Sequence, residues 1–201
     1  MLDHSVKSAT SIAALSQNEP MDRHSTLVLD AGGGDAVYLD RQRINCGGDN
    51  NVLKEFALER SGDNIRYRYI CCRFANNGNL CRLRHVVNGF TDDGDGDIVY
   101  LDRQYVHCQN GALNEVKLVR NGGHDQWRYE YLCCDFFHEY ISRLSCFNWS
   151  TGFTYDGEGK NYYLDRQTVS CGWEYFLQSF QLNRNSNHDN IRYTIRCCKV
   201  V

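Results

Sequence analysis

The sequence predicts an all-β fold built from three similar units, and two observations carry this prediction. The pentapeptide YLDRQ occurs three times, at Tyr38–Gln42, Tyr100–Gln104 and Tyr163–Gln167, with periods of 62 and 63 residues. A single cysteine follows each copy, and an adjacent Cys-Cys pair follows that cysteine 25 or 26 residues later. A unit of this length buries too little surface to stand alone, so we expect the three units to share one core.

Each unit consists of short runs with the pattern of strands. The first run, such as VYLDRQYVH at 99–107, alternates its two faces and predicts a strand. The second run, such as LKEFALER at 53–60, spaces its apolar residues by three and then two positions, which predicts a strand with a bulge or a short irregular entry. The third run, such as WRYEYLCC at 127–134, alternates again, and a turn sequence such as NGGHDQ precedes it. A short apolar piece and a glycine-acid loop come before each first run.

This pattern gives about four strands per unit and roughly twelve in all, which favours a closed β-trefoil or β-prism. We expect a flexible tail at 1–24 and a single β domain at 25–201. The repeats within that domain are expected at 25–87, 88–149 and 150–201.

Composition excludes several classes of partner. Hydrophobic residues make up 42% of the chain and charged residues 23%, as in ordinary globular proteins. The net charge of −3 is too weak to indicate binding to nucleic acid or to an anionic membrane surface. No apolar run approaches the roughly 18–20 residues that a membrane-spanning helix needs.

Cysteine usage indicates an oxidising compartment. The chain has eleven cysteines and no C-x-x-C pair of the kind that grips zinc. Adjacent cysteines on a strand point to opposite faces and therefore suit two disulfide partners. We expect an extracellular protein. The predicted disulfide cysteines are Cys46, Cys71, Cys72, Cys81, Cys108, Cys133, Cys134, Cys146, Cys171, Cys197 and Cys198.

The simplest pairing lies within each unit. Cys46 would join one member of the pair at 71–72, and the other member would join Cys81. The second unit would repeat this with Cys108, the pair at 133–134 and Cys146. The third unit has no fourth cysteine, so one thiol of the pair at 197–198 would be left free or bridge two chains. The N-terminal segment shows no signal-peptide pattern, which this prediction of an extracellular location does not explain.

The centre of YLDRQ is the candidate ligand site, and two interpretations of it stand. Aspartate and arginine side chains beside a tyrosine can bind the hydroxyl groups and apolar face of a sugar. Alternatively, each aspartate pairs inside the sheet with a repeated arginine, Arg66, Arg128 or Arg192. The candidate residues are Asp40, Arg41, Asp102, Arg103, Asp165 and Arg166.

Two further sites are weaker candidates. Asp93, Asp95 and Asp97 alternate with glycine like a calcium loop, although a solvated hairpin tip explains the same residues. No other cofactor is expected. Asn148 begins the acceptor sequence Asn-Trp-Ser for N-glycosylation at an expected loop. The histidines are scattered and no catalytic motif occurs, so we expect no enzymatic activity.

The segment from Cys108 to Phe136 resembles the repeat of dermatopontin and its invertebrate relatives. Asp125, Trp127 and Tyr129 before the pair at 133–134 match the family in kind, and so does the spacing from Cys72 to Cys81. The order of Asp, Arg and Gln departs from the family, and the resemblance covers about half of each unit. It implies an extracellular, disulfide-linked, non-enzymatic protein that acts in matrix assembly, cell adhesion or lectin binding.

These observations predict a secreted adhesion or carbohydrate- and matrix-binding protein with three similar units. Its partners would be glycans or matrix proteins, and three weak sites would gain by multivalency. The alternative is a structural subunit of an extracellular polymer or fibril. In that case the leftover cysteine or the N-terminal tail would link copies into a homo-oligomer.

Overall fold

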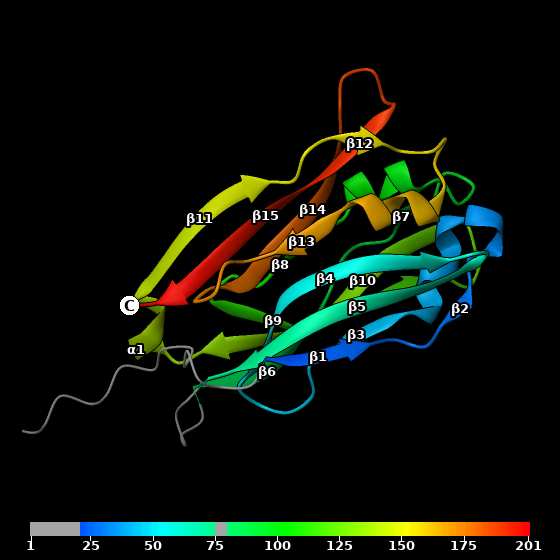
Figure 1. Cartoon of the computed structure of the whole chain (residues 1–201). Coiled ribbons are helices and arrows are strands. Elements are labelled where there is room, and N and C mark those ends of the chain that lie inside the picture. Colours follow the sequence, from blue (N-terminus) through cyan, green and yellow to red (C-terminus); the bar gives the residue numbers. More distant parts are fainter. Residues whose placement is uncertain (1–20, 75–79) are drawn as a thin grey trace, which may run out of the picture.

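The computed structural model describes residues 21–74 and 80–201, which form three antiparallel sheets of five strands each (Figure 1). The predicted all-β class is confirmed. Each sheet is organised around one long hairpin, and the three hairpins are β4–β5, β9–β10 and β14–β15. In the part of the chain that is described, no helix is long and apolar enough to cross a bilayer.

The elements have the following bounds. The first sheet contains β1 (Asp22–Ser25), β2 (Leu29–Asp30), β4 (Asn51–Ser61), β5 (Asn64–Arg73) and β13 (Thr168–Ser170). The second contains β3 (Arg43–Asn45), β6 (Cys81–Val87), β7 (Thr91–Asp92), β9 (Gly111–Arg120) and β10 (Gln126–Phe136). The third contains β8 (Tyr105–His107), β11 (Leu144–Ser150), β12 (Thr154–Tyr155), β14 (Phe176–Arg184) and β15 (Asn190–Val200). The helical segments are η1 (Gly32–Gly34), η2 (Ala36–Arg41), η3 (Ile98–Arg103), α1 (His138–Ile141) and η4 (Asn161–Arg166).

The second and third runs of each unit form the long hairpins, as their alternation predicted. The predicted irregularity in the second run is also confirmed. The register shifts in all three hairpins, between Leu53 and Glu55 in the first and between Leu177 and Ser179 in the third. In the second, the shift lies opposite Leu132 and Cys133. The bulge adds one residue to β4, β9 and β14 at the same place.

The predicted strand over YLDRQ is wrong. These residues form the 3-10 helices η2, η3 and η4, which gather at the end of the molecule away from the C-terminus (Figure 1). In η3 the ring of Tyr100 lies on Gly94, where an added Cβ would sit 2.3 Å from the ring. The Asp97 carboxylate caps this helix by accepting a hydrogen bond from the Val99 amide at 2.9 Å. The loop geometry before YLDRQ therefore imposes the turn, which alternation alone does not reveal.

η2, η3 and η4 each lead into a three-residue strand, and this strand pairs with the long hairpin of another unit. β3 pairs with β9, β8 pairs with β14, and β13 pairs with β4 in the first sheet. The exchange of short strands therefore runs through all three sheets and returns to the first. The sheets themselves remain open, so the predicted closed trefoil or prism is not found.

Two strands pair across the expected boundaries between repeats. β6 lies in the region assigned to the first repeat, 25–87, but it pairs with β10 of the second hairpin. Likewise β11 falls before the expected boundary at 149–150 and pairs with β15. β1 begins at Asp22, inside the expected tail at 1–24, while residues 1–20 lie outside the described part.

The glutamine of each YLDRQ copy is buried and ties three segments together. The Gln104 amide nitrogen donates to the Gly89 carbonyl at 3.2 Å and to the Thr91 hydroxyl at 2.7 Å. Its oxygen accepts from the Tyr129 amide of β10 at 3.3 Å and from the side chain of Asn88 at 3.1 Å. Gln167 likewise donates to the Gly152 carbonyl and the Thr154 hydroxyl. Gln42 donates to the carbonyls of Leu27 and Ile65.

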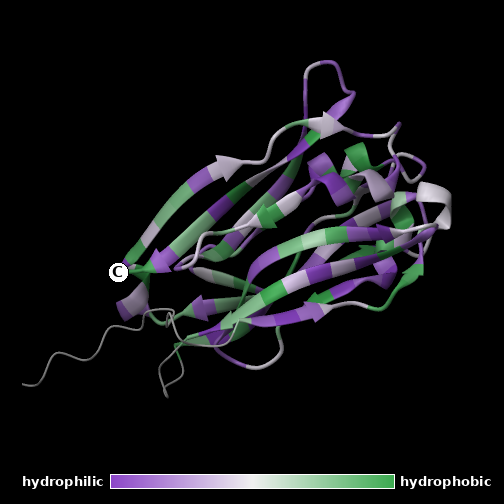
Figure 2. Ribbon diagram, viewed as in Figure 1, coloured by the Kyte–Doolittle hydropathy of each residue, from purple (hydrophilic) through white to green (hydrophobic). Residues whose placement is uncertain are grey.

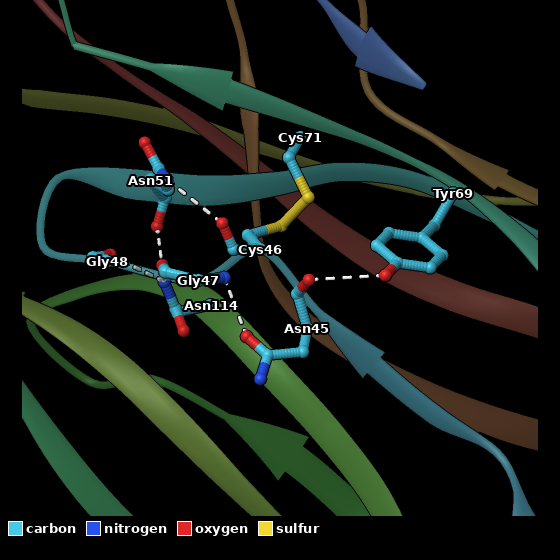
Figure 3. The surroundings of a disulfide bond; sticks show 8 residues. All are labelled: Asn45, Cys46, Gly47, Gly48, Asn51, Tyr69, Cys71 and Asn114. Carbon is cyan, nitrogen blue, oxygen red and sulfur yellow. Dashed lines mark hydrogen bonds between the residues drawn. A yellow bond between two sulfur atoms is a disulfide. The ribbon is translucent and has the colours of Figure 1, made fainter. Parts of the chain in front are cut away.

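Five disulfides form, and three of them join neighbouring sheets. Each of these three links the end of a short exchanged strand to the long hairpin that follows it in the sequence. They are Cys46–Cys71, Cys108–Cys133 and Cys171–Cys197, and all three lie within the predicted units. Around the first bridge, Asn114 of β9 donates to the carbonyls of Gly47 and Asn51, which fixes the loop between β3 and β4 (Figure 3).

The other two disulfides correct the expected pairing. Cys81 bonds to Cys134 and Cys146 to Cys198, each within one sheet, because β6 and β11 pair with the hairpins that follow them in the sequence. The unpaired thiol is therefore Cys72 rather than one at 197–198. Cys72 is buried, and burial raises the pKa of its thiol. A bridge through Cys72 to another chain is disfavoured by its burial.

Hydrophobic side chains meet in two buried clusters. The larger lies between the three hairpins and includes Phe56, Phe180 and Leu101. The smaller contains Phe74, Phe136 and Phe176, whose ring centroids lie 5.3–5.8 Å apart. Along the hairpin strands hydrophobic and hydrophilic bands alternate, as expected for sheets with one covered face (Figure 2).

We expect that Met21→Cys will form a sixth disulfide. The pairing of β1 with β5 begins with Asp22 opposite Cys71, so continuing it by one residue would bring Met21 to Cys72, as Cys146 lies opposite Cys198 in the third sheet. Met21 packs against the cluster that contains Cys72. In the chain-entropy account a bridge closing a loop of this length contributes about 3–5 kcal/mol to the free energy of unfolding. Denaturant unfolding and mass spectrometry after alkylation would test this, with Met21→Ala as control. One free thiol in the wild type and none in the variant are expected, and a reactive thiol in oxidised Met21→Cys would contradict the register.

We expect that Gln104→Ala will lower the free energy of unfolding by about 2–4 kcal/mol. The substitution leaves buried donors and acceptors without partners, which costs about 1–3 kcal/mol for each such group. Arg103→Ala is the neighbouring control, because this exposed side chain only covers the Tyr100 ring, and its loss should cost about 0.5–1 kcal/mol. Equal effects of the two substitutions would contradict the role assigned to the glutamine.

Candidate ligand-binding site

Two of the three candidate aspartates are used inside the protein. Arg120 of β9 donates from Nε to Asp40 at 2.9 Å, and Arg184 of β14 donates from Nε to Asp102 at 2.7 Å. Both aspartate side chains are 19% exposed. The structural interpretation of these two residues is therefore supported, but with other arginines than Arg66, Arg128 and Arg192.

The candidate arginines are also occupied, although their guanidinium groups are exposed. Arg41, Arg103 and Arg166 lie over the tyrosine rings of their own YLDRQ copies at 4.1, 4.1 and 4.3 Å from the ring centroids. Each covers the ring face that would otherwise stack on a sugar.

Asp165 differs from the other two aspartates. It is exposed, and no ion pair within the described residues engages its carboxylate. It lies at the side of a cleft of about 500 Å³ between η4 and the β4–β5 hairpin of the first sheet. The residues that line this cleft, called here the Asp165 cleft, are Val28, Leu58, Glu59, Arg60, Ser61, Asn64, Ile65, Arg66 and Asp165.

One reason why the Asp165 cleft is open is the position of the Arg60 side chain. The second runs LKEFALER, LNEVKLVR and LQSFQLNR end in Arg60, Arg120 and Arg184, so Arg60 is the counterpart of the arginines that hold Asp40 and Asp102. Its guanidinium carbon instead lies 3.8 Å from the centroid of the Tyr162 ring, and Nε donates to the Gly62 carbonyl at 3.0 Å. The residue before YLDRQ is valine in the other two copies, so only Tyr162 offers this ring.

A second cause is the small side chain of Val28. Ten residues before the tyrosine of YLDRQ the three copies have Val28, Phe90 and Phe153. Arg128 lies over Phe90 at 4.3 Å and Arg192 over Phe153 at 4.4 Å. In the first sheet no such ring fills this place, and Arg66 instead forms an ion pair with Glu59 at 2.8 Å.

The sequence named Asp165 but did not separate it from its two counterparts. It missed Val28, Arg60, Ser61 and Asn64 altogether. The signal that could have found the site is the comparison of the three copies, because Val28 and Tyr162 are both positions where one copy departs in size from the other two.

The calcium candidates Asp93 and Asp97 take part in hydrogen bonds of the loop before η3 and of that helix. Asp93 accepts a hydrogen bond from the Asp95 amide at 3.1 Å, and Asp97 caps η3. Burial, together with the charges of Asp35 and other nearby aspartates, raises the pKa of Asp93. Within residues 21–74 and 80–201, no three His, Cys, Asp or Glu side chains come together as metal ligands.

The glycosylation candidate lies on a strand rather than in the expected loop. Asn148 is exposed on β11, the edge strand of the third sheet, and its side-chain oxygen accepts a hydrogen bond from Arg196 at 3.3 Å. Its position at an edge leaves room for a glycan on the outer side of the sheet.

Comparisons with family models, with curated proteins and with solved structures gave no significant match.

Neutralising the three aspartates should have unequal effects on stability. Asp40→Asn and Asp102→Asn remove the charge that Arg120 or Arg184 contacts, and we expect each to lower the free energy of unfolding by about 1–2 kcal/mol. Asp165→Asn removes no such contact, and its effect should stay within about 0.5 kcal/mol. Urea unfolding of the three variants would test this difference. A loss for Asp165→Asn as large as the other two would show that it also has a structural partner.

Proposed function

We propose that this is a secreted, non-enzymatic adhesion protein that binds an extracellular matrix ligand, a glycan or a protein, in the Asp165 cleft. The observation that carries the proposal is the unequal use of three corresponding aspartates. Two are held by arginines of the same chain, and the third lies at an open, polar cleft with an apolar floor. Specific sites commonly combine an apolar surface with a few converging polar groups.

The location outside the cell is supported by the cysteines. Ten of the eleven form disulfides, which indicates an oxidising environment. The exposed acceptor Asn148 agrees with passage through a secretory lumen. The resemblance to the dermatopontin family points to the same setting and the same adhesive role.

The cleft favours binding over catalysis. Glu59 is the second carboxylate in it, and it forms ion pairs with Arg66 at 2.8 Å and Arg68 at 3.3 Å. Glycoside hydrolysis needs two carboxyl groups that both reach the bond to be broken. Glu59 is engaged by arginines of its own sheet, so Asp165 is the carboxylate left to meet a ligand.

The proposal is for one site, not three. Phe90 and Phe153 stand at the positions that correspond to Val28, and each has an arginine over its ring. Asp40 and Asp102 are likewise engaged. Multivalent binding would then come from several copies of the chain on one surface rather than from three sites on one chain.

The test is binding of the oxidised protein to a glycan array and to a panel of immobilised matrix proteins. We expect specific binding that Val28→Phe reduces at least tenfold, because the larger ring would take up space in the cleft and offer Arg66 the contact that Phe90 and Phe153 offer Arg128 and Arg192. Val87→Phe is the matched control, since Val87 is 47% exposed on β6 of another sheet. Binding that Val28→Phe leaves intact would place the site elsewhere, and no binding to either panel would contradict the proposal.

A further inference from the structure

We infer that the group bound by Asp165 is a guanidinium, so that the Asp165 cleft receives an arginine side chain of a protein partner. This inference rests on the proposed function and chooses the protein among its two ligand classes. It follows from what the chain itself places against the two corresponding aspartates, and from the shape of the space that the first sheet leaves open.

The groups that the chain places against Asp40 and Asp102 indicate which group Asp165 would bind. At Asp40 and Asp102 the occupant is an arginine from the end of a neighbouring hairpin strand, at 2.9 and 2.7 Å. Asp165 occupies the same position in YLDRQ, and η4 packs on β4 as η2 packs on β9 and η3 on β14. The backbone frame that presents the carboxylate to a guanidinium is therefore present at the third site, and its internal occupant is not.

The internal occupant is held away by two contacts. Arg60 stacks on Tyr162 and donates to Gly62, and the other two copies have valine where Tyr162 stands. A guanidinium on an aromatic face gains about 0.5–1 kcal/mol at an exposed site, comparable with an exposed ion pair. Arg60 thus has an alternative to Asp165 that Arg120 and Arg184 lack.

The walls of the cleft suit the rest of an arginine side chain. Val28 is 54% exposed and offers apolar surface to its aliphatic stem, which long cationic side chains commonly bury, and the buried Leu58 and Ile65 lie deeper in the lining. Ser61 and Asn64 at the hairpin turn can hydrogen-bond the backbone of a bound peptide. A sugar would find no open aromatic face here, because Arg60 covers Tyr162.

Arginine is favoured over lysine by the shape of its head group. A planar guanidinium can place two N–H groups on one carboxylate, whereas an ammonium binds as a point charge. Glu59 does not compete for the ligand, because Arg66 and Arg68 already neutralise it. Arg60 remains a positive charge at the rim, so Arg60→Ala should strengthen binding.

The test is an NMR titration of the whole oxidised protein with Nα-acetyl-arginine N-methylamide. The citrulline analogue is the matched probe, since it has nearly the same shape without the charge. The lysine analogue keeps the charge but lacks the planar guanidinium group. We expect shifts of the Ser61, Asn64 and Asp165 amide signals, with affinity at least tenfold weaker for citrulline and weaker for lysine. Asp165→Asn should weaken arginine binding at least tenfold.

Tyr162→Val provides a second variant that mimics the other two copies. It should release Arg60 to pair with Asp165, as in the other two sheets, and thereby abolish arginine binding while the fold is kept. Equal binding of arginine and citrulline, or arginine binding unchanged in Asp165→Asn, would overturn the inference.

The outcome for the proposed function is separate. If a glycan binds and is lost in Val28→Phe while arginine does not compete, the cleft is a glycan site and only the guanidinium inference fails. If neither array binds the protein at the cleft, the proposed function fails as well.

Discussion

The exchange of short strands between sheets is the constraint on which the rest of the structure depends. Each sheet contains a three-residue strand that follows the YLDRQ motif of another unit, and β13 brings residues near 170 against β4 near 55. Pairing over such a separation is entropically costly, because the chain between the partners must be closed. The bridges Cys46–Cys71, Cys108–Cys133 and Cys171–Cys197 lie at the ends of these same strands. Each bridge closes a loop of 25 or 26 residues and ties the end of the exchanged strand to the hairpin of its own unit.

This constraint explains why YLDRQ is kept in every copy. Its tyrosine lies on a glycine of the preceding loop, its leucine enters the shared core, and its glutamine joins the short strand to the hairpin, as Tyr100, Leu101 and Gln104 show. The arginine covers the tyrosine ring. Four of the five residues thus have the same structural task in all three units. Repetition of the motif therefore reflects folding, and only the aspartate differs in use between copies.

The sequence predicted what depends on local pattern. Alternation and spacing identified the long hairpins and their bulges, because those signals lie within one strand. The sequence did not predict the 3-10 helices. A tyrosine that packs on a glycine gives the same alternation of apolar and polar residues as a strand does. The pairing of Cys81 was wrong because Cys72 is nearer along the chain, whereas strand pairing brings Cys134 to it. At the site, Asp165 was named, but its difference from Asp40 depends on Arg60 and Tyr162, which come from two different units.

A residue that differs from its counterparts in the other two copies indicates a ligand site only where no other side chain of the protein fills the space that results. Cys72 shows the contrary case, because Met21 packs against the cluster that contains it. Lys54 is buried next to this place and donates to the Trp173 carbonyl at 3.1 Å, so internal groups complete the contact. At Asp165 the opposite holds: the internal arginine turns away, the phenylalanine is replaced by valine, and a charged group lies at an open cleft. Two independent departures that open the same space are hard to attribute to folding, since folding is served equally well by the closed arrangement in the other two sheets.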